Sequence, residues 1–214
     1  MKYDTLLFDL DGTLFDTLDD LRNSVNHALK SAGFAERSRE EIRTFVGNGV
    51  RNLMLKAVPE GTSEERFEAV FAEFRAYYAL HCRDCSCPYP QIPALLEALK
   101  ERGCRMAVIS NKSDAEVKRL VEEYARGFFL AAVGDRPGIP RKPAPDAVLR
   151  TMEELGGTPE RTLYVGDSEV DILTARHAGL DCMAVTWGFR TREELIRAGA
   201  TALIDSPLEL LEHI

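Results

Sequence analysis

Two aspartates separated by one residue follow a short apolar run near the start of the chain. Leu6-Leu7-Phe8 leads into Asp9-Leu10-Asp11-Gly12-Thr13, which is typical of a buried strand that ends in a loop. In open α/β sheets, ligands bind where the strands end at their carboxyl edge. Alternation along an extended chain would place Asp9 and Asp11 on one side, where like charges oppose each other's ionisation unless a cation offsets them. The pair therefore indicates a bound metal or a carboxyl kept protonated. Both suit a site in which Asp9 attacks phosphorus and Asp11 transfers the proton.

Two other interpretations of this segment remain open at this stage. Asp and Gly are common turn residues, so the segment could be a turn that simply caps a strand. A calcium loop is a weaker alternative, because its third acidic or amide ligand would fall at Thr13 and such loops follow a helix rather than a strand.

Three further strand ends carry polar residues of complementary chemistry. Ser110-Asn111-Lys112 follows one apolar run, and Asp167 and Asp171 follow another. Lys142 comes after Arg141 and before Pro143 and Pro145, which stiffen the backbone. Separately, these are an N-cap, a surface lysine and an N-cap with an acidic first turn. Together they place acids, a hydroxyl and a cation along one sheet edge. Magnesium is the natural metal there, and the set predicts metal-assisted phosphoryl transfer through an aspartyl-phosphate.

Length and charge restrict the class of protein. A chain of 214 residues can form one α/β domain with a substantial insertion. It shows neither a membrane-length apolar run nor a signal sequence, so a cytoplasmic location is the default expectation. A formal charge of −8 disfavours nucleic-acid and anionic-membrane partners. A small anionic substrate is still compatible with it, and the oligomeric state is left open.

The five cysteines include a cluster that could bind a metal. His81, Cys82, Cys85 and Cys87 lie within seven residues, with the two-residue gap familiar from zinc sites. His81 is adjacent to Cys82, however, and no second pair occurs elsewhere, so reduced thiols are the favoured interpretation.

The hydrophobic period changes along the chain. Helical spacing dominates from Thr17 to Tyr78, and regular strand–helix alternation begins after Pro90. We therefore predict an α/β core with a doubly wound, parallel, Rossmann-like sheet, formed by residues 1–15 and 86–214. Residues 16–85 are predicted to form an inserted helical cap domain.

The four polar strings resemble the four motifs of the haloacid dehalogenase superfamily in order, spacing and strand context. The resemblance spans nearly the whole chain and implies Asp9 as nucleophile and Asp11 as general acid and then general base. It also implies magnesium held by Asp9, Asp167 and the Asp11 carbonyl, with Asp171 as a supporting ligand. Ser110, Asn111 and Lys142 are the implied phosphate-binding residues.

Within this superfamily the chain looks most like the bacterial phosphoglycolate phosphatases, which implies hydrolysis of 2-phosphoglycolate to glycolate and phosphate. The supporting strings are Val46-Gly47-Asn48-Gly49-Val50, Pro88-Tyr89-Pro90 and Val185-Thr186-Trp187-Gly188-Phe189-Arg190. Gln91 and Phe189 depart from the expected pattern. We expect Gly47, Asn48 and Arg51 to contact the substrate beyond its phosphate. A sugar-phosphate mutase, a pyrophosphatase or nucleotidase, and a non-catalytic binding protein are the alternatives.

Overall fold

The computed structural model describes residues 2–214 and divides into two compact units. One unit combines the chain up to Phe15 with Pro88–Ile214, and the other is Asp16–Cys87. The sequence placed the second boundary two residues earlier. The two residues concerned are Ser86 and Cys87, and the Ser86 N–H donates to Asp20, which binds Ser86 to the helical unit.

The α/β unit contains a six-stranded sheet in which every pairing is parallel. Its strands, in spatial order, are β5 (Ala131–Asp135), β4 (Arg105–Ser113), β1 (Thr5–Phe8), β6 (Thr162–Gly166), β7 (Asp181–Val185) and β8 (Leu203–Ile204). The first strand lies between β4 and β6, with Phe8 in register with Val108 and Val165. The predicted doubly wound sheet is therefore confirmed, and β1 ends where the strand order switches direction.

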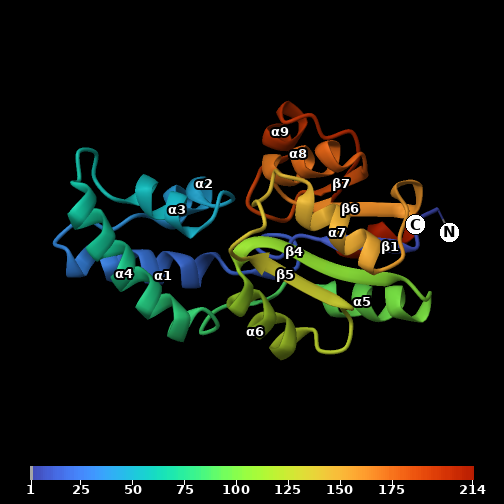
Figure 1. Ribbon diagram of the computed structural model, residues 1–214, viewed down its shortest axis with the longest axis horizontal. Helices are drawn as coiled ribbons and strands as arrows, with labels where there is room; N and C mark the ends of the chain where they lie inside the picture. Colours follow the sequence, from blue (N-terminus) through green and yellow to red (C-terminus); the bar gives the residue numbers. More distant parts are fainter. Residues whose placement is uncertain (1) are drawn as a thin grey trace. The chain divides into compact units, whose positions relative to one another are not determined.

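Alternation along β1 distributes its side chains between two cores. Leu6 and Phe8 pack in a cluster with α5 (Ile92–Glu101) and α6 (Asp114–Tyr124). Leu7 packs in a second cluster with α7 (Asp146–Glu154) and α8 (Glu169–Ala178). Figure 1 shows α5 and α6 on one side of the sheet and α8 on the other. Apolar layers thus cover both faces, and the strand ends are left as the place for polar groups.

Three shorter helices complete the α/β unit. These are α9 (Arg192–Arg197) and the 3₁₀-helices η1 (Pro159–Arg161) and η2 (Pro207–Glu212). The sequence predicted a final helix, and the structure gives it the tighter 3₁₀ form.

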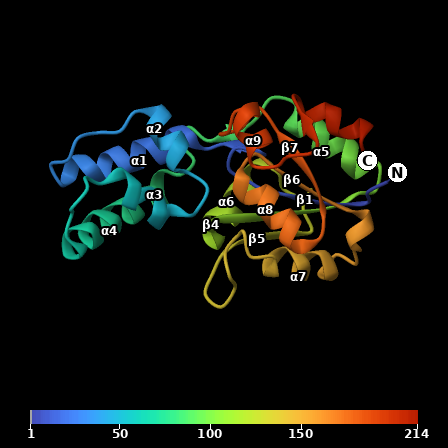
Figure 2. The same cartoon turned by 90° about the horizontal axis from the view of Figure 1, so that it is seen from above.

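The helical unit contains α1 (Leu18–Ser31), α2 (Arg39–Phe45), α3 (Val50–Ala57) and α4 (Glu64–His81). The first and last of these lie side by side in both ribbon views (Figures 1 and 2). A capping box begins α2, since the Glu41 N–H donates to the Ser38 hydroxyl and the Ser38 N–H donates to the Glu41 carboxylate. The chain passes from one unit to the other at β2 (Phe15–Asp16) and at β3 (Cys87–Pro88), and these two strands pair as a two-stranded sheet.

No helix within residues 2–214 combines the length and the apolar character that a bilayer crossing requires.

Asp20 is a buried carboxylate that fixes the end of the helical unit. It accepts hydrogen bonds from the Cys85 N–H (2.9 Å), the Ser86 N–H (2.8 Å) and the Ser86 hydroxyl (2.6 Å). Asp19 is its half-exposed neighbour and forms ion pairs with Arg39 (3.3 Å) and Arg22 (3.5 Å).

We expect Asp20→Ala to lower the free energy of unfolding by about 3 kcal/mol, because buried donors lose their acceptor. Asp19→Ala is the matched control and should cost less than about 1 kcal/mol, as exposed ion pairs usually do. Urea unfolding followed by circular dichroism measures both. Equal losses in the two variants would contradict the role assigned to Asp20.

Candidate active site

A buried lysine ammonium joins three of the groups at the sheet edge. Lys142 comes from the loop before α7, and its Nζ donates to Asp9 Oδ1 (2.6 Å), to Asp171 Oδ1 (2.7 Å) and to the Tyr164 hydroxyl (3.1 Å). Its side chain is only 4% exposed. The structure thus brings together Lys142, Asp9 and Asp171, which lie far apart in the sequence.

The loop that carries Lys142 is fixed by Asn111. The Asn111 side-chain amide donates to the Lys142 carbonyl (3.0 Å), and the Lys142 N–H donates to Asn111 Oδ1 (2.9 Å). This pairing gives the Asn111 side chain a positioning role that the sequence did not suggest. Phosphate binding by Asn111 stays a prediction, and it would fall to the main-chain N–H.

Three carboxylates form a group with the spacing of a metal site. One oxygen from each of Asp9, Asp167 and Asp171 lies within 4.8 Å of the others, and all three residues are buried. Gly12 and Gly188 leave room for this group, since a Cβ on either would come within 2.5 Å of the Asp167 side chain. Clustered carboxylate oxygens are ligands that Mg²⁺ prefers. The donor set therefore fits the predicted metal.

Hydrogen bonds fix the carboxylates of Asp167 and Asp171 in place. The Phe189 N–H donates to Asp167 Oδ2 (2.6 Å), and the Thr13 hydroxyl donates to Oδ1 (3.3 Å). Asp171 Oδ2 accepts from the Ser168 N–H (3.1 Å) and hydroxyl (2.6 Å). Asp171 therefore has two roles, since Oδ2 caps the start of α8 through Ser168 and Oδ1 accepts from Lys142.

The charges of this group are incompletely balanced within the protein. Burial raises the pKa of Asp9 to about 7 against the opposing effect of Lys142, and the carboxylates of Asp171 and Asp11 add to the rise. Burial, Asp171 and Asp9 likewise raise the pKa of Asp167 well above its usual range. Burial lowers the pKa of Lys142, yet Asp171 and Asp9 together raise it well above the ordinary lysine value. The lysine is therefore a permanent cation beside an excess of acidic groups.

Asp11 has a different cationic partner. Lys112 Nζ lies 2.8 Å from Asp11 Oδ1, and the Asp11 carboxylate is not part of the Asp9–Asp167–Asp171 group. Ser110 is buried two residues earlier in β4, where its hydroxyl accepts from the Lys112 N–H (3.2 Å).

Lys112 and Tyr164 are site residues that sequence reasoning did not select. The sequence ended the strand at Ile109, whereas β4 continues to Ser113. Had the strand been extended, alternation would have placed Lys112 on the same side as Ser110. Tyr164 gave no comparable signal, because an aromatic residue within a strand usually belongs to the core.

Of the candidate substrate residues of the helical unit, Gly47 and Asn48 lie between α2 and α3, and Arg51 lies in the first turn of α3. Asn48 is exposed, and Gly47 and Gly49 have φ angles of 129° and 80° that favour glycine. Arg51 is 41% exposed, pairs with Glu64 (3.2 Å) and Glu68 of α4, and lies over the Phe67 ring at 4.9 Å. Its contact with substrate stays a prediction, and these pairs show that it also stabilises the helical unit.

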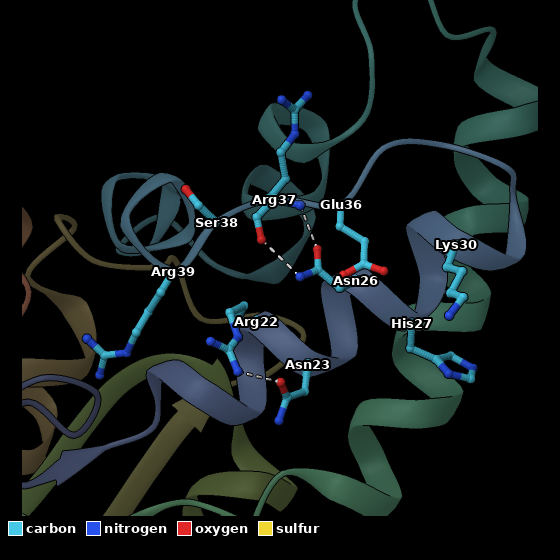
Figure 3. A pocket seen from close by; sticks show the side chains of 9 residues that line it. All are labelled: Arg22, Asn23, Asn26, His27, Lys30, Glu36, Arg37, Ser38 and Arg39. Atoms are coloured by element: carbon cyan, nitrogen blue, oxygen red, sulfur yellow. Dashed lines mark hydrogen bonds between the residues drawn. The ribbon is translucent and has the colours of Figure 1, made fainter.

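A hollow of about 370 Å³ lies wholly within the helical unit (Figure 3). Its basic lining residues are largely paired: Arg39 contacts Asp16 and Asp19, and Arg37 contacts Glu41. Asn26 bonds both the carbonyl (2.9 Å) and the N–H (2.8 Å) of Arg37, as the dashed lines in Figure 3 show. These contacts serve to hold the loop after α1.

The cysteine cluster does not have the geometry of a zinc site. Within residues 2–214 it is not among the groups of side chains close enough to share a metal. His81 Nδ1 lies 2.7 Å from Asp84 Oδ2, Cys82 is buried, and Cys85 and Cys87 are exposed.

Comparison with known proteins identifies the family. The model of the haloacid dehalogenase-like hydrolases matches residues 6–185. A phosphoglycolate phosphatase of Aquifex aeolicus is 37% identical over 185 residues, covering 86% of this chain and 85% of its own. Phosphoglycolate phosphatase 1 of Pseudomonas aeruginosa is 36% identical over 212 residues, covering 96% and 78%.

A solved structure agrees with these sequence matches. The crystal structure of a candidate phosphoglycolate phosphatase from Lactobacillus delbrueckii subsp. bulgaricus superposes with a TM-score of 0.95 at 36% identity, covering 100% of this chain and 99% of that one. The chain belongs to the haloacid dehalogenase-like hydrolases and is a phosphatase of that family.

Proposed function

We propose that the protein hydrolyses small phosphomonoesters in two steps through an aspartyl-phosphate (an acyl phosphate) on Asp9. An oxygen of Asp9 attacks phosphorus while the bond to the leaving oxygen breaks, and Asp11 donates a proton to that oxygen. Asp11 then removes a proton from water, which attacks the same phosphorus and releases Asp9 and inorganic phosphate. The observation that carries this proposal is the pair of aspartates with separate lysine partners, Lys142 for Asp9 and Lys112 for Asp11.

The buried acidic group is the proposed magnesium site. Asp9, Asp167 and the main-chain carbonyl of Asp11 are the proposed ligands. Asp171 suits a supporting role, because its oxygens already contact Lys142 and Ser168. Bound Mg²⁺ would offset the negative charge of the carboxylates and of the substrate phosphate.

The phosphate would be bound by groups of opposite or neutral charge around Asp9. Lys142 supplies a fixed ammonium, Ser110 a hydroxyl, and Asn111 a main-chain N–H. The substrate that we propose is 2-phosphoglycolate, which gives glycolate and phosphate. This choice is supported by the names of the relatives, at 36–37% identity. We expect Gly47, Asn48 and Arg51 of the helical unit to contact the substrate beyond its phosphate, with Arg51 binding its carboxylate.

Asp9→Asn should abolish turnover while the protein still folds, because an amide cannot act as the anionic nucleophile. We expect a loss of about a thousand-fold or more, as for other covalent nucleophiles. Steady-state hydrolysis of 2-phosphoglycolate with Mg²⁺, beside a thermal melt, measures this. Substantial activity in the pure variant would exclude Asp9 as the nucleophile.

Asp9→Asn should also change how the stability of the metal-free protein depends on pH. The ordinary Asp pKa is 3.8 and the folded value is about 7, so between these values the folded state holds a proton that the unfolded state has lost. The stability that Asp9 contributes is thus present at low pH and is lost as pH rises through 7, with a limiting slope of about 1.4 kcal/mol per pH unit.

The variant lacks this loss, so its melting temperature minus that of the wild type should rise from pH 5 to pH 7 and then level off. Thermal melts in EDTA measure the difference, and added Mg²⁺ should reduce it at pH 8. If the melting temperatures of the two proteins depend on pH in the same way, the Asp9 carboxylate does not destabilise the metal-free protein.

Arg51→Ala tests the proposed contact with the substrate carboxylate. A shielded charge-assisted hydrogen bond is worth roughly 1.5–3 kcal/mol, so kcat/KM for 2-phosphoglycolate should fall about 10- to 100-fold. The loss for p-nitrophenyl phosphate should be much smaller. Glu68→Gln is the control, since it weakens the same ion pair but keeps the guanidinium. If Arg51→Ala lowers kcat/KM equally for both substrates, Arg51 acts only in the structure of the helical unit.

A further inference from the structure

Lys112 and Asp11 form an ion pair that is almost completely shielded from solvent. The Nζ and Oδ1 atoms lie 2.8 Å apart, and the side chains are 1% and 14% exposed. A lysine side chain that is nearly fully buried has lost most of its rotamer freedom, and its charge needs a fixed partner. The pair is therefore a defined part of the site.

The main chain around Asp11 is also fixed. The N–H groups of Thr13, Leu14 and Phe15 all donate to the Leu10 carbonyl, and the Gly12 N–H donates to the Phe15 carbonyl. This turn leaves the side-chain torsions of Asp11 as its main freedom, and the contact with Lys112 restrains them.

The chemistry of the pair distinguishes the two oxygens of Asp11. An ammonium group donates hydrogen bonds and accepts none, so Oδ1 must accept from Lys112. A proton on the Asp11 carboxyl then belongs on Oδ2. Lys112 would thereby fix the orientation of the Asp11 carboxyl and determine which of its oxygens transfers the proton.

We propose that Lys112 is a positioning residue that orients Asp11 for proton transfer to the leaving oxygen; this rests on the proposed function. As the phosphorus–oxygen bond breaks and the bond to Asp9 forms, Oδ2 gives its proton to the departing oxygen. The same oxygen takes a proton from water when the acyl phosphate on Asp9 is hydrolysed. Lys112 contacts neither the phosphorus nor the leaving group in this scheme.

Measuring kcat/KM of the Lys112→Met variant on three substrates separates the positioning role from phosphate binding and from contact with the substrate carboxylate. Ethyl phosphate has a poor leaving group, 2-phosphoglycolate has a poor leaving group and a carboxylate, and p-nitrophenyl phosphate has a good leaving group that needs little protonation. Because kcat/KM covers the first chemical step, we expect it to fall roughly 10- to 100-fold for the first two substrates and less than about threefold for the third.

Further variants provide the controls. Lys118→Met removes an exposed lysine of α6 that pairs with Asp114 and should leave all three values unchanged. Asp11→Asn should show the same dependence on leaving group, and adding Lys112→Met to it should cause no further loss. Lys112→Arg, which keeps a donor for Oδ1, should recover part of the activity on ethyl phosphate. Lys112→Gln replaces Lys112→Met if thermal melts show that the Met variant does not fold.

Equal losses on all three substrates would overturn the proposal and assign Lys112 to phosphate binding or to general charge balance. A loss confined to 2-phosphoglycolate would overturn it in favour of a contact with the substrate carboxylate. Failure of the proposed function is a separate result, in which the wild type lacks Mg²⁺-dependent hydrolysis or Asp9→Asn retains it.

Discussion

The burial of several carboxylates at one sheet edge is the constraint on which this site depends. Removing an ionised carboxylate from water is costly unless a partner compensates for it. Lys142 provides that partner for Asp9 and Asp171 at 2.6 and 2.7 Å, but one ammonium cannot balance three acids. Burial raises the pKa of Asp9 and Asp167, and the remaining excess of negative charge adds to the rise. A divalent cation at this group would offset the same excess.

The end of β4 organises the site through side chains that serve other segments. Asn111 holds the main chain of Lys142, and Lys112 holds the carboxylate of Asp11. This arrangement follows from the strand order, because β4 lies directly beside β1 and its end reaches the loops on either side. Asp9 and Asp11, only two residues apart, thus have separate cationic partners, Lys142 from the loop before α7 and Lys112 from the end of β4.

The helical unit is stabilised by local capping and by ion pairs of its own. Asp20 accepts three hydrogen bonds from residues 85 and 86, and Arg51 pairs with two glutamates of α4. A residue such as Arg51 can therefore contribute to folding and to recognition at once. Its structural pairs are visible within this unit, whereas its role toward a substrate depends on measurements that vary the substrate.

The sequence by itself determined the fold class, the helical insertion and the acidic residues of the site, because hydrophobic period and short-range spacing are local properties. The strand ends near Phe8 and Val165 could be recognised from the apolar runs that precede them, whereas β4 continues beyond Ile109 to Ser113. The partners could not be recognised in this way. Lys112 was taken as part of a loop because the continuation of β4 to Ser113 comes from pairing with β5, and nothing local to Asn111 indicated that its side chain pairs with the main chain of Lys142. Tyr164 was hidden among core residues. The cation–carboxylate pairs join residues 29 to 133 positions apart in the sequence, so only the tertiary structure, which brings these segments together at one sheet edge, decided which cation meets which carboxylate.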